Sequence, residues 1–293
     1  MIISMNGTLV DEQQAVVSVY DHGFLYGLGL FETFRTYSTK PFLLQQHLER
    51  LSASCRELSI QYAPQEDRIR ELIQQLLTVN ELQDAYIRLT VSAGKDILGL
   101  PSGDYVQPTE IMYIKPLPPK DEKAYQIGKA LQLLKLSRNT PEGIYRFKSL
   151  HYMNNILAKR ELQNYSWAQG AEGLFLTDEG YLAEGIVSNL FFVKNSVCYT
   201  PSLDTGILPG ITRAFVLKVL QHIQVPAEEG LYTWEDLVQA DEVFIVNSIQ
   251  EITPISTLYT PTGTSLHVGQ ARTGPLANRL ISEYRRHTGS ETG

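Results

Sequence analysis

The first half of the chain combines short alternating apolar segments with two helical apolar repeats. Asn6-Gly7 separates two alternating segments, which predicts a two-residue β-hairpin. Apolar residues recur at helical spacing over about 45–60 and, after Pro64, over about 65–79. The other apolar segments of this half predict strands over 15–21, 29–38, 84–94 and 109–117, with a glycine-containing turn between the first two. This half is therefore predicted to be mixed α and β.

The second half alternates between strands and helices. Helical spacing predicts helices directly after Lys148 and over 210–223, 233–240 and 274–287. Apolar runs and alternations predict strands over 129–136, a hairpin over 173–185, and further strands over 188–201 and 241–248.

A proline-rich, charged segment lies between the two halves. Residues 115–124 contain three prolines and a cluster of charges, which is typical of a linker between domains. We therefore expect a small N-terminal α+β domain over 1–117, a linker over 118–122 and a larger C-terminal domain over 123–293.

The composition restricts the function more than the fold. A hydrophobic content of 43% with 19% charged residues is typical of a soluble globular protein. The net charge of −7 disfavours a nucleic acid or an anionic membrane as partner. No apolar run approaches the roughly 18 residues of a membrane span, and the N-terminus lacks the pattern of a signal peptide. A cytoplasmic protein is expected.

Cysteine and histidine spacing predicts neither a disulfide nor a metal site. Cys55 falls on the apolar face of a predicted helix and Cys198 in a predicted strand. Both are expected to be buried thiols in a reducing compartment. The six histidines show no metal-ligand spacing such as His-x-x-x-His.

Lys148 is the first candidate for chemistry. It precedes a predicted helix and lies among apolar and aromatic residues such as Phe147 and Leu150, whereas Lys159 lies on the polar face of that helix. Burying an ammonium costs free energy and lowers its pKa, so such a lysine is either a structural accident or a nucleophile. Its position alone favours the structural interpretation.

Glu184 is the second candidate. It lies on the same face of a predicted strand as Leu182, so a carboxylate points where an apolar side chain has just pointed. Ser188 and Asn189 follow it with short polar side chains that can bind a ligand or their own backbone. Alone, Glu184 is interpreted as a carboxylate at the end of a strand.

Two further features are weak signals when each is taken alone: Thr212 is equally consistent with a plain helix cap, and Gly210 with a plain turn. Leu208, Pro209 and Gly210 lead into a helix that begins near Ile211-Thr212, and free amides at a helix N-terminus bind anions. Asn247 and Ser248 place small polar groups at the end of a predicted strand. A nucleophilic amine, a carboxylate for a cationic ring nitrogen and a phosphate site are together the requirements of pyridoxal 5′-phosphate (PLP).

Four motifs carry a family resemblance. FKSLHYMNN, YLAEGIVSNLFF, LPGITR and EITPI resemble, in order and spacing, the successive motifs of the fold-type IV PLP enzymes. That family includes branched-chain and D-amino-acid aminotransferases and 4-amino-4-deoxychorismate lyase. The resemblance covers nearly the whole chain. It implies a two-domain α+β fold like that of D-amino-acid aminotransferase, with PLP in the cleft between the domains, and a homodimer.

The resemblance also implies roles for individual residues. Lys148 corresponds to the lysine that forms a Schiff base with PLP and shuttles a proton, and Glu184 to the partner of the pyridine nitrogen. Arg50, which helical spacing alone places on a solvated face, corresponds to a phosphate-binding arginine. The implied cofactor-binding residues are Arg50, Lys148, Glu184, Ser188, Asn189, Leu208, Ile211, Thr212, Asn247 and Ser248.

Within the family, the segment over 21–51 is most similar to aminodeoxychorismate lyases of Gram-positive bacteria. Phe31 stands where D-amino-acid aminotransferases have a tyrosine, and SAGKDILGLP lacks their Arg-x-His pair. LHYMN replaces the Gly-Asn-Tyr of branched-chain aminotransferases. These departures favour a lyase that converts 4-amino-4-deoxychorismate to 4-aminobenzoate and pyruvate in folate biosynthesis.

Two alternatives remain at this point. One is a PLP-dependent aminotransferase of D-amino acids or branched-chain amino acids, and the other is a non-catalytic binding protein on the same fold. The substrate is expected to be a small molecule, with no nucleic acid or membrane partner. The candidates for binding its carboxylates are Tyr26, Arg35, Arg88 and Lys95.

Overall fold

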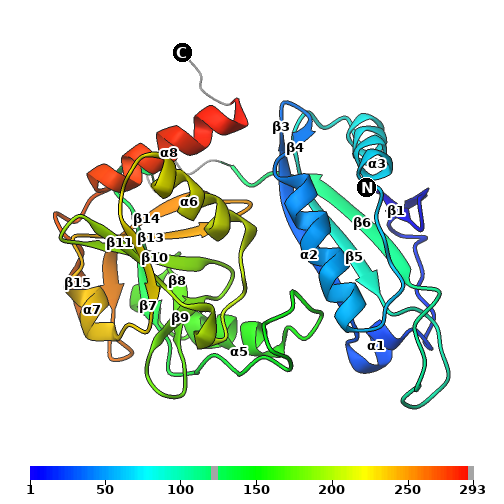
Figure 1. Cartoon of the computed structure of the whole chain (residues 1–293), viewed down its shortest axis with the longest axis horizontal. Helices are drawn as coiled ribbons and strands as arrows, with labels where there is room; N and C mark the ends of the chain where they lie inside the picture. The colour runs from blue at the N-terminus through cyan, green and yellow to red at the C-terminus, as the bar shows by residue number, and fades with distance from the viewer. Residues whose placement is uncertain (120–124, 290–293) are drawn as a thin grey trace. The chain divides into compact units, whose positions relative to one another are not determined.

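The computed structural model describes residues 1–119 and 125–289, which form two compact units (Figure 1). Unit 1 contains residues 1–118 together with 147–151, and unit 2 contains the other described residues. The linker expected over 118–122 lies mostly outside the described residues, so the expected domain bounds stay a prediction.

Unit 1 is built on a six-stranded sheet with the order β2-β1-β6-β5-β3-β4. All neighbouring strands in it are antiparallel. The strands are β1 (Ile2–Met5), β2 (Thr8–Asp11), β3 (Gly29–Tyr37), β4 (Lys40–Pro41), β5 (Ala85–Ser92) and β6 (Thr109–Pro116). Met5 pairs with Thr8 across Asn6-Gly7, and both turn residues have positive φ, which confirms the predicted hairpin.

Two of the three helices of unit 1 cover one face of this sheet (Figure 1). The helices are α1 (His22–Tyr26), α2 (Leu44–Glu57) and α3 (Glu66–Val79). Both predicted apolar faces are buried, for example at Leu51 and Cys55 of α2 and at Ile69 and Ile73 of α3. They pack with the sheet into one hydrophobic core.

The strand predicted over 15–21 is wrong. This segment has no regular strand structure, and α1 follows it where a turn was predicted. Val16 and Val19 are 77% and 64% exposed, so the alternation does not mark a buried face. Alternation predicts a strand only where a neighbouring strand and a core are present to receive it.

The segment 147–151 returns to unit 1 and pairs with the start of β3. Phe31 N donates to the Lys148 carbonyl at 2.8 Å, and Leu150 N donates to the Gly29 carbonyl at 2.9 Å. Phe147 packs against the core of the unit. The backbone of Lys148 is therefore fixed to β3 by long-range pairing, although it follows the expected linker in sequence.

Unit 2 contains a nine-stranded sheet with the order β12-β11-β10-β13-β14-β7-β8-β9, and β15 pairs with β14. Its strands are β7 (Lys129–Leu133), β8 (Glu172–Leu176), β9 (Leu182–Gly185), β10 (Asn189–Lys194), β11 (Val197–Pro201), β12 (Ala227–Gly230), β13 (Glu242–Asn247), β14 (Glu251–Tyr259) and β15 (Ser265–His267). The β11–β12, β14–β7 and β7–β8 pairs are parallel and the others antiparallel. The predicted strands of this half are confirmed, whereas β12, β14 and β15 were not predicted.

The predicted helices of unit 2 are confirmed. They are α5 (Met153–Gln163), α6 (Ile211–His222), α7 (Trp234–Val238) and α8 (Pro275–Thr288), with short 3₁₀ helices at Ser166–Ala168 and Leu203–Thr205. α6 and α8 pack on each other and against β13 and β14 (Figure 1). Cys198 in this unit and Cys55 in unit 1 are buried thiols, as predicted, and burial raises the pKa of each to about 12.

Candidate active site

The side chain of Lys148 lies against an aromatic ring of unit 1. Its Nζ is 4.7 Å from the centroid of Phe31, within the range of a cation–π interaction. Phe31 is 2% exposed and Lys148 is half-buried. An aromatic neighbour of the amine is thus a residue of β3, far from Lys148 in sequence.

The side chain of Arg88, a residue of β5, lies over the same Phe31 ring. The Arg88 guanidinium carbon lies 3.7 Å from the Phe31 centroid, and Arg88 Nε donates to Thr90 Oγ1 at 3.2 Å. Thr33 is the register partner of Arg88, so Phe31, Thr33 and Arg88 occupy one face of the sheet. Two cationic side chains therefore approach one buried ring.

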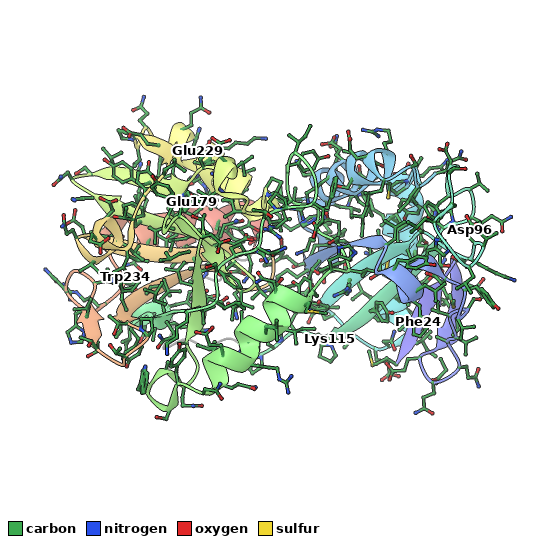
Figure 2. All side chains as sticks on the ribbon, turned by 90° about the horizontal axis from the view of Figure 1, so that it is seen from below. Phe24, Asp96, Lys115, Glu179, Glu229 and Trp234 are labelled. Atoms are coloured by element: carbon green, nitrogen blue, oxygen red, sulfur yellow. The ribbon has the colours of Figure 1, made fainter. Side chains whose placement is uncertain are left out.

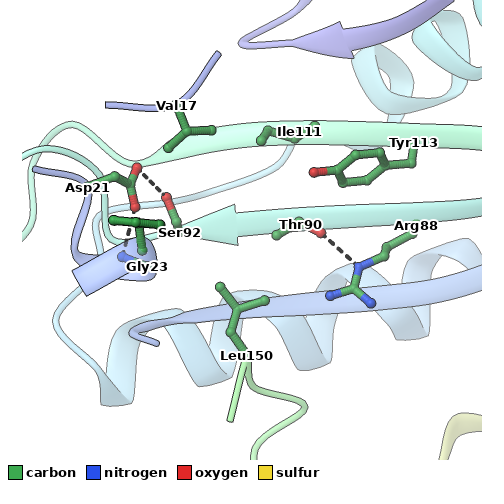
Figure 3. Close-up of a pocket in the computed structure, with 10 residues that line it drawn as sticks. Val17, Asp21, Gly23, Arg88, Thr90, Ser92, Ile111, Tyr113 and Leu150 are labelled. Carbon is green, nitrogen blue, oxygen red and sulfur yellow. Dashed lines mark hydrogen bonds between the residues drawn. The ribbon is translucent and has the colours of Figure 1, made fainter. Parts of the chain in front are cut away.

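Arg88 lines a cavity of about 420 Å³ within unit 1, shown in Figure 3. Asp21 at one end of it accepts hydrogen bonds from Ser92 Oγ and Gly23 N, each at 2.7 Å. The lining residues are Val17, Asp21, Gly23, Phe24, Arg88, Thr90, Ser92, Ile111, Tyr113 and Leu150. A mainly apolar cavity with one guanidinium suits an organic anion.

The other predicted substrate residues are not among those that line this cavity in the described part of the chain. Tyr26 is half-exposed, and its hydroxyl accepts a hydrogen bond from Gly99 N at 2.9 Å. The Arg35 guanidinium lies 4.4 Å from the Tyr37 centroid. Lys95 is exposed. Their roles stay predictions, and Arg88 is the candidate that the cavity favours.

Arg50 of α2 is held by a buried carboxylate of β3. Its Nε and Nη2 donate to the two oxygens of Glu32 at 2.8 and 2.6 Å, and His47 Nδ1 lies 2.6 Å from Glu32 Oε2. Glu32 is 1% exposed. Burial alone raises the pKa of Glu32, but Arg50 and His47 outweigh this effect and lower the pKa to about 2. Burial also lowers the pKa of His47, against the opposing effect of Glu32.

Glu32 and His47 were missed by the sequence reading. The available signal for Glu32 was a glutamate between the apolar Leu30 and Phe34 on the buried face of a strand. The signal for His47 was its position one helical turn before Arg50. The bidentate contact fixes the direction of the Arg50 guanidinium, which a solvated arginine would not maintain.

In unit 2, Glu184 of β9 is 4% exposed and accepts three hydrogen bonds. Arg138 Nε donates to Oε1 at 2.9 Å, while Asn189 Nδ2 and Leu208 N donate to Oε2 at 3.3 and 3.1 Å. Arg146 Nε lies 3.8 Å from Oε1. Every one of these neighbours is a donor, so the arrangement requires Glu184 to be ionised. Arg138 and Arg146 were also missed by the sequence reading.

The N-terminus of α6 carries the other polar groups predicted in unit 2. α6 begins at Ile211 after Gly210, and no side chain caps it. Thr212 Oγ1 lies 3.2 Å from Ser248 Oγ. A Cβ on Gly210 would lie 2.0 Å from Asn189 Oδ1, so a larger residue here would displace the Asn189 side chain. Uncapped amides beside two hydroxyls favour a phosphate group.

Two predicted residues of this region behave differently from each other. Ser188 Oγ is buried and has no hydrogen-bond partner among the described residues. Asn247 Oδ1 accepts from Ile249 N at 2.9 Å and Gln250 N at 2.7 Å, which closes the turn between β13 and β14. The Asn247 side-chain oxygen therefore supports the turn, and the role of Ser188 stays a prediction.

The groups within each unit fit PLP. In unit 2, ionised Glu184 suits a protonated ring nitrogen, and the α6 amides with Thr212 and Ser248 suit a phosphate. Unit 1 holds Lys148 and the fixed Arg50, which suit an aldehyde and a phosphate. The predicted residues thus form two groups, one in each unit, whose roles stay predictions.

The described residues, 1–119 and 125–289, hold neither a candidate metal site nor a candidate membrane span. They contain no group of three or more His, Cys, Asp or Glu side chains arranged for a metal ion. No helix in them combines the length and the apolar character that crossing a membrane requires.

Comparisons with known proteins confirm the resemblance and the fold class. Residues 29–258 match the family model described as amino-transferase class IV. The chain is 44% identical to the aminodeoxychorismate lyase of Bacillus subtilis over 257 residues, which cover 87% of this chain and 86% of that protein. It is similar in structure to the branched-chain amino acid aminotransferase of Escherichia coli, with a TM-score of 0.87, 28% identity and coverage of 99% and 96%. The 4-amino-4-deoxychorismate lyase of Pseudomonas aeruginosa matches with a TM-score of 0.83, 28% identity and coverage of 97% and 98%.

Proposed function

Because the chain belongs to the amino-transferase class IV family, we propose that it is a PLP-dependent carbon–oxygen lyase. Its substrate is 4-amino-4-deoxychorismate and its products are 4-aminobenzoate and pyruvate, a step of folate biosynthesis. The observation that carries this proposal is the 44% identity with the aminodeoxychorismate lyase of B. subtilis over 87% of the chain. Phe31 agrees with it, since the family resemblance implies a tyrosine at this position in D-amino-acid aminotransferases.

The cofactor of this reaction is PLP, which supplies an electron sink for the carbanion formed at the substrate. Lys148 would hold the PLP aldehyde and would remove the proton from C4 of the substrate ring. Glu184 would accept a hydrogen bond from the protonated ring nitrogen. Leu208 and Asn189 keep the Glu184 carboxylate in place through their bonds to Oε2.

The chemistry balances without any other reactant. Loss of the C4 proton is followed by cleavage of the C3–O bond, and the ring becomes aromatic as 4-aminobenzoate. The proton taken by Lys148 leaves with the enolpyruvate, which becomes pyruvate. Since aromatisation drives the reaction, the protein mainly provides orientation and charge stabilisation.

Each unit has its own candidate groups for the phosphate of PLP. In unit 1 the candidate is Arg50, whose direction Glu32 fixes. In unit 2 the candidates are the amides at Ile211 and Thr212 and the hydroxyl of Ser248. A helix N-terminus and an arginine both favour a dianion, so these groups anchor the cofactor and leave the ring chemistry to Lys148 and Glu184.

Arg88 is proposed to bind a substrate carboxylate. It lies in an apolar cavity and on the ring that Lys148 also contacts, so a bound anion is placed close to the amine. A guanidinium can bind a carboxylate with two parallel hydrogen bonds. The acceptor Thr90 already orients it through Nε.

The second candidate is an aminotransferase, which the structural similarity to the E. coli branched-chain enzyme favours. An aminotransferase keeps the amino group on the cofactor and requires a keto acid to complete its cycle, whereas the lyase does not. The third, a non-catalytic PLP-binding protein, predicts cofactor binding without turnover.

One experiment distinguishes the three. The purified protein, loaded with PLP, is given 4-amino-4-deoxychorismate without any keto acid, and 4-aminobenzoate and pyruvate are quantified. The lyase forms both in equal amounts. Separate assays offer D-alanine or L-leucine with 2-oxoglutarate. Fast transamination with no 4-aminobenzoate identifies the aminotransferase, and bound PLP with no product in any assay identifies the binding protein.

A cytoplasmic homodimer is part of the proposal. The support for the dimer is a cluster of exposed apolar side chains on α1 and on the loop between β5 and β6, where Phe24, Leu98 and Leu100 are 72%, 73% and 86% exposed. Tyr26 and Gly99 join these two segments by a hydrogen bond of 2.9 Å. Light scattering of the purified holoprotein tests the dimer, and a monomeric mass at micromolar concentration rejects it.

A further inference from the structure

Arg138 is a buried arginine that bonds Glu184 and is itself held from several sides. It is 8% exposed, and its backbone N donates to the Leu176 carbonyl at 2.8 Å. Its Nη1 donates to Asn154 Oδ1 at 2.7 Å and lies 3.3 Å from Asn155 Oδ1. Because Nε also donates to Glu184 Oε1 at 2.9 Å, the guanidinium has a fixed orientation.

Arg146 is also close to Glu184 but is engaged elsewhere. Its Nε donates to the Gly206 carbonyl at 2.6 Å, and its Nη2 donates to the Asn139 carbonyl. The distance from Nε to Glu184 Oε1 is 3.8 Å, beyond a hydrogen bond. Burial and the nearby Arg138 lower the pKa of Arg146 to about 10. Arg146 therefore holds two loops, and Arg138 is the arginine that bonds the carboxylate.

The charges of this cluster do not by themselves favour a cationic ring. Two arginines and one glutamate leave a net charge of +1 beside Glu184. A protonated ring nitrogen adds another positive charge, which electrostatics alone disfavours. The ring proton is retained only if a correctly directed, ionised carboxylate accepts its hydrogen bond, so the orientation of Glu184 matters more than the sum of charges.

We infer that Arg138 is a positioning residue that directs Glu184 and thereby decides how strongly the protein prefers a ring with a protonated nitrogen. This inference rests on the proposed PLP chemistry. Arg138 does not act on the reacting atoms. It fixes Oε1 from one side, while Asn189 and Leu208 fix Oε2, so that the carboxylate keeps one direction toward its ligand.

The test compares two ligands of the apoprotein that differ at the ring nitrogen. They are PLP and its 1-deaza analogue, in which a CH group replaces the nitrogen. Both keep the aldehyde and the phosphate, so the ratio of their dissociation constants isolates the interaction of the nitrogen with Glu184. The wild type should bind PLP more tightly. In Arg138→Met the preference should fall about tenfold, equivalent to about 1.4 kcal/mol.

Two further variants make the test specific. Glu184→Gln should lose the same preference, and adding Arg138→Met to it should change the ratio no further, because Arg138 acts through Glu184. Arg213→Met is the matched control. Arg213 is a 4% exposed arginine of unit 2 that bonds the Pro201 carbonyl and Glu229, an exposed residue at the outer rim of the unit (Figure 2). Its removal should leave the ratio unchanged.

Each outcome decides the inference. If Arg138→Met weakens both ligands equally, or strengthens the preference for PLP, the positioning role is wrong. If Arg138→Met does not fold, as judged by thermal melting of the apoprotein, Arg138→Lys replaces it. That variant keeps the charge without the planar guanidinium, and an unchanged ratio then rejects the inference. A wild type that binds neither ligand contradicts the proposed function instead.

Discussion

Each unit buries a glutamate against an arginine. In unit 1 the arginine is proposed to bind the cofactor, whereas in unit 2 the glutamate is. In unit 1 the side chains of Glu32 and Arg50 are 1% and 13% exposed, and protein donors occupy both oxygens of Glu32. In unit 2 the values for Glu184 and Arg138 are 6% and 7%. In unit 1 the more exposed side chain is the one proposed to bind the cofactor. In unit 2 the two exposures are nearly equal and do not distinguish the members.

In each pair, the member that holds the other has a further side-chain partner of its own. Glu32 is bonded by Arg50 and His47, which leaves the carboxylate as a holder and the arginine as the group that reaches outward. Arg138 is bonded to Asn154 as well as to Glu184, so here the arginine is the holder. A buried Glu–Arg pair can therefore offer a ligand either the guanidinium or the carboxylate, depending on which of the two the rest of the protein holds in place.

The largest effect should come from a residue outside both pairs. Lys148→Ala should lower the rate of 4-aminobenzoate formation by about 10⁴-fold, because it removes both the nucleophile and the proton carrier. Product assays measure this, and the absorbance of protein-bound PLP should be lost with it. Lys159→Ala, at an exposed position of α5, should retain both. Borohydride reduction of the wild type should fix PLP to Lys148, and attachment at Lys159 would contradict the assignment.

The unit 1 pair can be broken by replacing Glu32, the residue that holds Arg50. Glu32→Gln leaves Arg50 without its charged partner in a buried setting, so the free energy of unfolding should fall by about 3–5 kcal/mol in urea titrations of the apoprotein. Glu66→Gln is the control, because Glu66 and Arg70 form an exposed pair on α3, whose loss should change stability by no more than about 1 kcal/mol. Equal losses in the two variants would show that Glu32 is not a structural holder.

Acid should weaken unit 1 through the same carboxylate. The pKa of Glu32 falls from 4.5 to about 2 on folding, so its contribution is fully present above pH 4.5 and is lost as the pH falls to about 2. The loss should be roughly 3 kcal/mol over this interval. The lowered pKa of His47 acts in the same direction, beginning near its ordinary value of 6.5. Urea titrations at several pH values measure both, and a Glu32→Gln variant with the same acid loss below pH 4.5 would contradict the assignment.

The unit 2 pair can be broken by replacing Glu184, the residue proposed to bind the ring nitrogen. Glu184→Gln should lower kcat and kcat/KM together by about 10²-fold, or about 2.7 kcal/mol, because the ring nitrogen loses its charged acceptor mainly in the transition state. PLP should stay bound through its phosphate, as absorbance after gel filtration would report. Wild-type turnover in this variant would remove Glu184 from the mechanism.

The smallest expected effect belongs to the cavity of unit 1. Arg88→Met should raise KM for 4-amino-4-deoxychorismate about tenfold with little change in kcat, since it removes binding that is equal in ground and transition states. Arg35→Met, whose side chain lies on Tyr37 and not in the cavity, provides the comparison. Equal increases in KM would show that charge alone, and not the cavity, decides substrate binding.

The sequence predicted much of the local structure because local rules govern it. The Asn6-Gly7 hairpin and the helices α2 and α3 follow from turn chemistry and apolar spacing. β14 was not predicted, and it carries Pro254, a residue that argues against a strand inside a sheet. The structure nevertheless pairs Pro254 with Phe244 of β13.

The sequence by itself determined the family, the candidate amine at Lys148 and the candidate carboxylate at Glu184, since these reside in short motifs. The tertiary structure alone decided which groups direct them. Arg138 lies 46 residues from Glu184, and Arg50 lies 18 residues from Glu32. Phe31 reaches Lys148 only because the segment 147–151 pairs with β3. Such contacts depend on strand register and long-range pairing, which no local periodicity encodes, because a shift of one residue would turn each side chain to the other face.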